Sequence, residues 1–221
     1  MRTTHTVRLK AAGRYASGVL VTSELVDAAL AVQSDHGARD FRSHVTARAD
    51  FILTAGHFLR GPGGDSEVQV RSSTFTGTAQ GHVSIFGTDI GVLKINGRAP
   101  TTPLPAISPW RLSIGQQTVT YGFGGRSTAT VPKTLHGRVL LKVPFALSRN
   151  TFTRVRHGVV VFNSPEPAIR GDSGGPVLAD GLVYGLQSMI TDPLGFNTRL
   201  ATVATLSQHL PAIRRAIEQL A

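Results

Sequence analysis

Short hydrophobic runs alternate with turn residues along the whole chain, and most of the runs are typical of β-strands. Several of them alternate apolar and polar positions with a period of two. Glycine and proline separate the runs at short intervals, which favours an all-β sandwich or barrel over alternating β and α units. The predicted strands cover residues 18–22, 51–56, 67–71, 82–86, 89–95, 117–123, 137–143, 158–162, 176–190 and 197–203.

Two segments divide this pattern. Residues 96–109 contain four prolines and little periodicity, so they predict a linker between two halves of similar size. Near the C-terminus Ile213, Ile217 and Leu220 fall on one helical face, which predicts a terminal helix. We therefore expect one domain with three parts: an N-terminal half over 1–100, a linker and C-terminal half over 101–205, and a helix over 206–221. Residues 27–50 predict a surface excursion with a helical turn over 27–33.

Composition is consistent with a packed core. Of 221 residues, 41% are hydrophobic and 16% are charged, and there is no cysteine, so no disulfide can form. The first fifteen residues contain no apolar run that could serve as a signal-peptide core. No stretch approaches the roughly 20 apolar residues of a membrane helix, so no membrane partner is expected. The compartment stays unknown, with the cytoplasm slightly favoured.

The formal net charge of +10 raises the alternative of a polyanion partner. The basic residues are scattered, however, and Arg214 and Arg215 form the only adjacent pair. A solvated basic surface is therefore favoured over nucleic-acid binding.

The strongest candidate for chemistry is the string GDSGGP at residues 171–176. A nucleophilic serine needs an exposed hydroxyl and nearby amide donors for the oxyanion that forms on attack. The glycines around Ser173 let the backbone turn tightly and let the N–H groups of Gly171 and Ser173 point into one volume. This string indicates a nucleophile more strongly than an ordinary glycine-rich turn.

Two further signals are weak alone. His57 follows the apolar run FILTAG, and an imidazole can accept a serine proton. Asp89 opens an apolar strand, where a buried acid needs a partner such as an imidazole N–H. Together with Ser173 these residues follow the order His, Asp, Ser, which is that of the chymotrypsin type of triad. The histidine and aspartate precede the linker and the serine follows it, which predicts a site between the two halves.

From residue 18 to the terminal helix, the sequence resembles the trypsin/chymotrypsin family of serine peptidases, especially its small bacterial members. The motifs that carry this resemblance are LTAGH at 53–57, DIGVLKI at 89–95, YGFGG at 121–125, GDSGGPV at 171–177 and VYGLQSMI at 183–190. The resemblance implies an all-β fold of two six-stranded antiparallel β-barrels with a C-terminal helix. It also implies a catalytic cleft between the barrels.

The resemblance implies a role for each site residue. His57, Asp89 and Ser173 would form the catalytic triad, and the N–H groups of Gly171 and Ser173 would form the oxyanion hole. Ser188 would support Asp89, and the buried Asp172 would need a cation. The remaining substrate-binding residues would form two groups: one wall of the substrate pocket, and a strand whose main chain pairs with the substrate. The wall is Pro167, Ala168, Ile169 and Arg170, and the strand is Ser188, Met189 and Ile190.

Three departures from the family pattern matter. The chain begins MRTTHTV, without the family's apolar activation N-terminus, so an internal arginine such as Arg126, or the packing of the second barrel, would have to hold Asp172. Pro167 stands at the pocket floor, where trypsin-like preference would need an aspartate. Ile190 replaces a glycine that would leave the pocket deep. We therefore expect small or modest apolar residues before the cleaved bond.

These observations predict a serine endopeptidase that acts on protein or peptide substrates through an acyl-enzyme on Ser173. No metal or other cofactor is expected, because the histidines lack paired metal spacing and the loop 61–67 offers too few ligands. The alternative is a trypsin-fold binding module that is catalytically silent or regulated by a partner protein.

Overall fold

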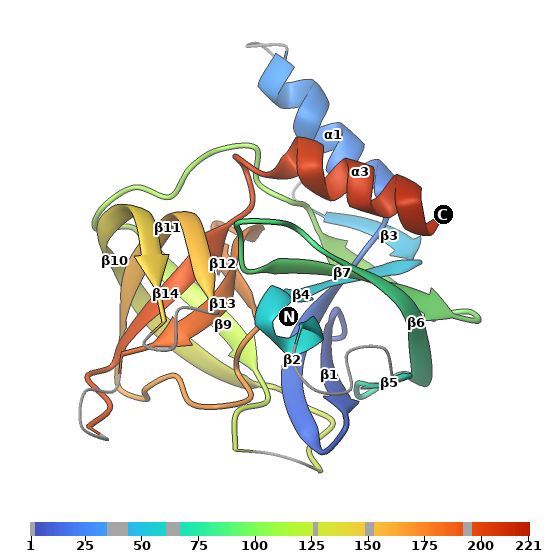
Figure 1. The fold of residues 1–221 in the computed structure, drawn as a ribbon, viewed down its shortest axis with the longest axis horizontal. Coiled ribbons are helices and arrows are strands. Elements are labelled where there is room, and N and C mark those ends of the chain that lie inside the picture. The colour runs from blue at the N-terminus through green and yellow to red at the C-terminus, as the bar shows by residue number, and fades with distance from the viewer. Residues whose placement is uncertain (1–2, 35–43, 61–66, 126–127, 149–152, 192–195) are drawn as a thin grey trace.

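The fold was analysed in a computed structural model that describes residues 3–34, 44–60, 67–125, 128–148, 153–191 and 196–221. Two closed β-barrels lie side by side, and two helices, α1 and α3, lie together across one end of the first barrel (Figure 1). Each barrel contains six strands, and all their pairings are antiparallel. The predicted fold class, two six-stranded antiparallel barrels with a C-terminal helix, is confirmed.

The first barrel closes in the strand order β1-β2-β4-β7-β6-β5. The largely buried strands β4 and β7 pair with each other, and the candidate residues His57 and Asp89 lie at their ends. The six strands are β1 (Thr6–Ala11), β2 (Arg14–Val21), β4 (Phe51–Ala55), β5 (Val68–Arg71), β6 (Thr76–Ser84) and β7 (Ile90–Asn96).

The second barrel closes in the order β10-β11-β14-β13-β12-β9. The predicted strand over 176–190 is two strands here, because Asp180 and Gly181, both with positive φ, form the turn of a hairpin. The six strands are β9 (Gln117–Gly122), β10 (Lys133–Leu147), β11 (Arg154–Asn163), β12 (Pro176–Ala179), β13 (Leu182–Ile190) and β14 (Leu200–Thr205).

The linker is more ordered than its prolines predicted. Its residues Thr101–Pro105 form β8, which pairs with β3 (His44–Arg48) in a separate two-stranded sheet. Pro103 and Pro105 are two residues apart, so both turn their missing N–H to the same, unpaired side of the strand. Neither β3 nor β8 was predicted, and β1 was also missed.

The helices pack where the sequence placed apolar faces. The predicted helical turn over 27–33 is a longer helix, α1 (Ser23–Ser34), whose start is capped by the hydroxyl of Thr22 on the amide of Leu25. The terminal helix α3 (Leu210–Leu220) buries Leu210, Ile213 and Ile217. One turn, α2 (Gly56–Leu59), carries His57. No helix in the described ranges has the length and apolar character needed to cross a membrane.

Candidate active site

His57 lies where β4 ends and α2 begins, so the buried strand delivers it to the edge of the first barrel. The amide of Gly56 donates to the main-chain oxygen of Asp89 at 3.0 Å. The amide of His57 donates to Asp89 Oδ1 at 2.7 Å. Because β4 and β7 are neighbours in the barrel, these bonds tie the backbone of the histidine to the start of the aspartate strand.

Asp89 is fully buried and joins both barrels. Its Oδ2 accepts from His57 Nδ1 at 2.8 Å and from the hydroxyl of Ser188, on β13 of the second barrel, at 2.5 Å. Arg60 Nη2 lies 3.3 Å from Oδ1 and supplies a cation. A carboxylate only accepts, so the proton of a neutral His57 is on Nδ1, and Nε2 keeps a lone pair that can take a proton.

Ser173 is held by main-chain bonds from both barrels. Its carbonyl accepts from the amide of Ser17 on β2, and the amide of Gly174 donates to Gln187 on β13. The Ser173 hydroxyl donates to the carbonyl of Ser188 at 3.1 Å, and in the described part of the chain it makes no hydrogen bond with His57. Both side chains line the same cavity. A rotation about χ1 of the serine redirects its hydroxyl.

The backbone before Ser173 presents two amides. Gly171 has a φ of +99°, which glycine adopts without strain. The carbonyl of Arg170 accepts from the amide of Gly125, and because a trans peptide is planar the N–H of Gly171 points the opposite way. Within the described residues neither the Gly171 nor the Ser173 amide has an acceptor. The arrangement can therefore hold an oxyanion.

Asp172 is also fully buried, and Lys133 supplies its cation. Lys133 Nζ lies 3.1 Å from Asp172 Oδ2, with its side chain only 9% exposed. The amides of Gly124 and Ile169 donate to the two carboxylate oxygens at 2.7 and 2.9 Å. The sequence reasoning missed Lys133, because nothing in its local sequence connects it with Asp172. The other cation considered, Arg126, lies outside the described residues.

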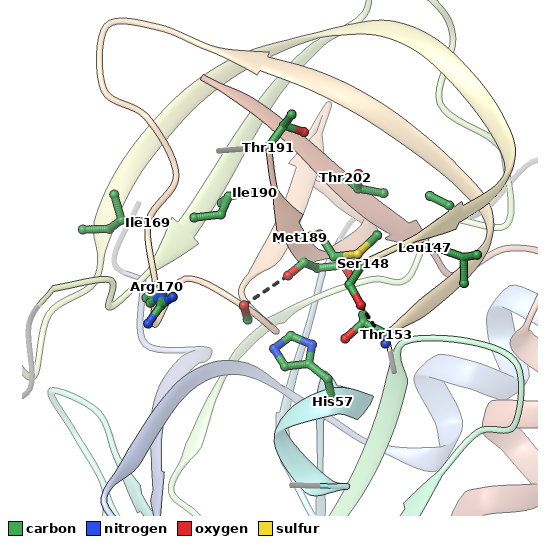
Figure 2. A pocket seen from close by; sticks show the side chains of 13 residues that line it. His57, Leu147, Ser148, Thr153, Ile169, Arg170, Met189, Ile190, Thr191 and Thr202 are labelled. Carbon is green, nitrogen blue, oxygen red and sulfur yellow. Dashed lines mark hydrogen bonds between the residues drawn. The ribbon is translucent and has the colours of Figure 1, made fainter. Parts of the chain in front are cut away.

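A cavity of about 530 Å³ opens beside Ser173, with Arg170 and Leu147 on opposite sides of it (Figure 2). Five of the predicted substrate-binding residues line it: Ile169, Arg170, Ser188, Met189 and Ile190. Pro167 does not line it, and Ala168 is buried in a small cluster with Leu135 and Ala201 instead. The lining residues that sequence reasoning missed are Ala146, Leu147, Ser148, Thr153, Thr191 and Thr202.

Three of the missed residues, Ala146, Leu147 and Thr202, lie on paired strands. Thr202 faces the cavity because it pairs with Met189 across β13 and β14. Ala146 and Leu147 lie at the end of β10, which extends four residues beyond the predicted strand over 137–143. The register of β10 with β11 and of β13 with β14 was the information that could have identified these residues. Among the described residues no cluster of histidine, aspartate or glutamate could hold a metal ion.

The family follows from a match over most of the chain. The family model described as Trypsin matches residues 28–207. The chain therefore belongs to the trypsin family, and it is a chymotrypsin-like serine endopeptidase. No curated protein sequence matches it.

Solved structures share its fold at low sequence identity. The active form of the Rv3671c protease from M. tuberculosis has a TM-score of 0.68 at 13% identity, over 96% of this chain and 81% of that chain. The HtrA-type protease AlgW with a tripeptide has a TM-score of 0.68 at 16% identity, over 99% of this chain and 62% of that chain. Kallikrein-related peptidase 10 has a TM-score of 0.67 at 15% identity, over 98% and 96%.

Proposed function

We propose that the chain cleaves peptide bonds through an acyl-enzyme on Ser173, with His57 as general base and Asp89 as the residue that orients it. Ser173 Oγ attacks the peptide carbonyl while His57 Nε2 takes its proton. Asp89 keeps the other ring proton on Nδ1 and stabilises the imidazolium cation. The negative oxygen that forms is held by the N–H groups of Gly171 and Ser173.

The intermediate then collapses in two steps. The C–N bond breaks, His57 gives its proton to the departing amine, and the acyl group stays on Ser173 Oγ. Water next attacks the ester while His57 Nε2 takes its proton, and the serine recovers that proton as the acid leaves.

The observation that carries this proposal is the position of Asp89. One buried carboxylate accepts from His57 of the first barrel and from Ser188 of the second. The amides of Gly171 and Ser173, which have no acceptor among the described residues, lie next to the side chain of Ser173, and this side chain shares a cavity with His57. Burying a charged carboxylate costs free energy even when, as here, four groups donate to it. A role in catalysis accounts for its presence at this position.

We further propose a preference for small or modest apolar residues before the cleaved bond. Among the residues that the structure describes, no acidic side chain lines the cavity to pair with lysine or arginine. Ile190 packs against the cluster of Leu135, Ala168 and Ala201, which supports a shallow pocket because its side chain fills space that a deep one needs. Cleavage of a peptide library tests this preference. Cleavage dominated by arginine or phenylalanine at that position contradicts it.

Replacement of the nucleophile tests the mechanism. Ser173→Ala removes the attacking oxygen, so we expect kcat to fall by at least about 1000-fold with the fold retained. The exposed Ser113 provides the matched control, and Ser113→Ala keeps wild-type turnover. Wild-type peptidase activity in Ser173→Ala contradicts the proposed role. Circular dichroism of both variants checks the fold.

A second candidate is the same site under control of a partner protein, or catalytically silent as a binding module. The hydrogen bond from Ser173 to the carbonyl of Ser188 favours it, because the hydroxyl must leave this bond to reach His57. Turnover of library peptides by the isolated chain decides between the two. Measurable turnover supports the free enzyme, and its absence with intact folding supports control by a partner or a silent site.

A further inference from the structure

The short helix α2 brings a cation to Asp89 as well as His57. Arg60 follows the last residue of α2, and its amide donates to the main-chain oxygen of Gly56 at 3.1 Å. Residues three apart on a helical turn are neighbours on its surface, so the side chains of His57 and Arg60 can reach the same group. His57 Nδ1 lies 2.8 Å from Asp89 Oδ2, and Arg60 Nη2 lies 3.3 Å from Asp89 Oδ1.

Two further contacts hold the guanidinium of Arg60 in this place. Its Nη1 donates to the hydroxyl of Ser84 at 2.5 Å and to the main-chain oxygen of Thr88 at 3.3 Å. Ser84 ends β6, and Thr88 lies in the turn that leads from β6 to Asp89 and β7. The cation is therefore bound to the same turn as the carboxylate, although its side chain is 36% exposed.

Gly56 leaves room for this guanidinium. A Cβ added to Gly56 would lie 2.7 Å from Arg60 Nη1 and 3.0 Å from the hydroxyl oxygen of Ser84. Gly56 is not among the described glycines with positive φ, so its backbone conformation does not itself need a glycine. The atom that a side chain here would meet first belongs to Arg60, which gives a spatial reason for glycine at this position.

Asp89 has hydrogen-bond donors without Arg60. Its two oxygens accept from the amide of His57, from His57 Nδ1 and from the hydroxyl of Ser188. Arg60 adds a positive charge beside the carboxylate. A carboxylate stabilises the protonated form of an imidazole that contacts it, and a cation next to that carboxylate weakens the stabilisation. The imidazole then loses its proton at a lower pH than it would without the cation.

We propose that Arg60 is a positioning residue that offsets part of the Asp89 charge, so that His57 stays neutral and able to accept the serine proton to a lower pH than Asp89 alone would allow. This inference rests on the proposed function, in which His57 is the general base. Other charged or titratable side chains line a cavity with His57 or lie against the turn before Asp89. In the described residues these are Arg14, Tyr15, Arg156 and Arg170.

Titration of His57 in the Ser173→Ala variant tests the proposal without relying on turnover. NMR follows the ring signals of the eight histidines, and the spectrum of a chain with His57→Gln identifies the signal of His57. We expect Arg60→Gln to raise the midpoint of the His57 titration by about half a pH unit, an amount that suits a cation partly exposed to solvent. Arg60→Lys keeps the charge, so it should keep most of the parent midpoint.

Gly56→Ala reaches the same interaction by another route. The added methyl group should push the flexible guanidinium away from Asp89, so the midpoint should rise as it does in Arg60→Gln. In the double variant the two effects should not add, because both act through Arg60. Arg98→Gln is the matched control for the loss of one positive charge. Arg98 is exposed and forms no ion pair with Asp89, so the midpoint should stay unchanged.

The kcat/KM of the active chain gives the functional readout. On the acid side of its pH profile, Arg60→Gln should have about a third of the kcat/KM of the wild type, the factor that corresponds to half a pH unit. On the plateau at higher pH the two values should agree within about twofold. A purely structural role of Arg60 would instead lower kcat/KM by the same factor at every pH.

Two results overturn the inference. One is a His57 midpoint that Arg60→Gln leaves unchanged or lowers. The other is an equal rise in Arg98→Gln, which would show an effect of overall charge. Both concern the ring alone and are distinct from failure of the proposed function. Turnover with an unchanged midpoint leaves the peptidase assignment intact, whereas a raised midpoint without turnover leaves the effect of Arg60 on His57 intact.

Discussion

Asp89 and Asp172 are both fully buried carboxylates, and each has a cation and at least one backbone amide as partners. Asp89 differs because it also contacts an imidazole and a hydroxyl, groups that can take part in proton transfer or tune it. Asp172 contacts a lysine and two backbone amides, which fix the turn before Ser173. The first arrangement suits chemistry, and the second holds the amides of the candidate oxyanion hole in position.

Removal of the Lys133 cation tests this difference. Lys133→Met leaves Asp172 charged and buried without its ion-pair partner, a change that typically costs about 3–5 kcal/mol. We expect the free energy of unfolding to fall by an amount of this order and kcat to fall, because the backbone at Gly171 loses its support. Urea unfolding and peptidase assays measure both effects.

Lys142→Met is the matched control for that experiment, because Lys142 is exposed on the same strand, β10. It should keep the wild-type kcat and unfolding midpoint. Wild-type behaviour of Lys133→Met would show that the ion pair does not support the site.

His5 makes stability depend on pH. Burial lowers the pKa of this imidazole from 6.5 to about 4, and neither ring nitrogen has a hydrogen-bond partner in the described part of the chain. Above about pH 6.5 the ring is neutral in folded and unfolded chains alike. As pH falls from 6.5 towards 4, the unfolded chain binds a proton that the folded chain does not, so the free energy of unfolding decreases.

Between about pH 7.5 and pH 5 this loss should reach about 2 kcal/mol. His5→Leu removes the titrating group while keeping an apolar side chain of similar size. We therefore expect the variant to lose less stability than the wild type over the same range, measured by urea unfolding at each pH. The same pH dependence in both proteins would mean that His5 is not the responsible group.

At the scale of elements, the sequence predicted strands with a continuous apolar run better than strands that depend on a distant partner. β4 and β7 were clear because their residues are almost all apolar. β8 was hidden by prolines, since pairing with β3 depends on a partner more than 50 residues away in sequence. α1 appeared only as a turn, because its stability comes from packing against α3 as well as from its own residues.

The terminal helix α3 offers a test at this scale. Ile217 is 1% exposed and packs into the core of the molecule. Ile217→Ala should lower the free energy of unfolding by about 3 kcal/mol through lost burial and the cavity left behind. The exposed neighbour Gln219 is the control, and Gln219→Ala should change stability by about 0.5 kcal/mol or less. Equal effects of the two changes would contradict the observed packing of the helix.

At the scale of the whole molecule, the site exists only where the barrels meet. Gly174 lies at this contact with a φ of +82°, and a Cβ added there would overlap the Ser17 carbonyl and lie 2.7 Å from the amide of Ala55. Ser17 also donates its amide to Ser173. The spacing of the barrels is therefore coupled to the position of the candidate nucleophile.

Gly174→Ala should separate the barrels locally and reduce kcat by at least about tenfold, since small displacements of reacting groups are costly to catalysis. Gly181→Ala is a matched control, because Gly181 has a φ of +79° and open space around its Cα. It should cost about 1 kcal/mol of stability through backbone strain, with kcat unchanged. Retained kcat in Gly174→Ala would contradict the coupling.

The sequence predicts those site residues that belong to a local motif, and it misses those whose role depends on contacts with residues far away along the chain. Short local motifs identified His57, Asp89 and Ser173 as candidates. Their positions relative to the linker predicted that the histidine and aspartate belong to the first half of the chain and the serine to the second. Lys133 carries no local signal, because its role arises only when β10 is set against the loop around Gly171. The depth of the substrate cavity likewise depends on the register of β13 with β14.

Reaction of the intact chain with a fluorophosphonate tests the central assignment most directly. The reagent bonds only to a serine that is activated by a base and flanked by oxyanion donors. Mass spectrometry of the wild type should find one adduct, mapped to Ser173 and absent from both Ser173→Ala and His57→Ala. A folded wild-type chain without an adduct on Ser173, or with an equal adduct in His57→Ala, would contradict the account.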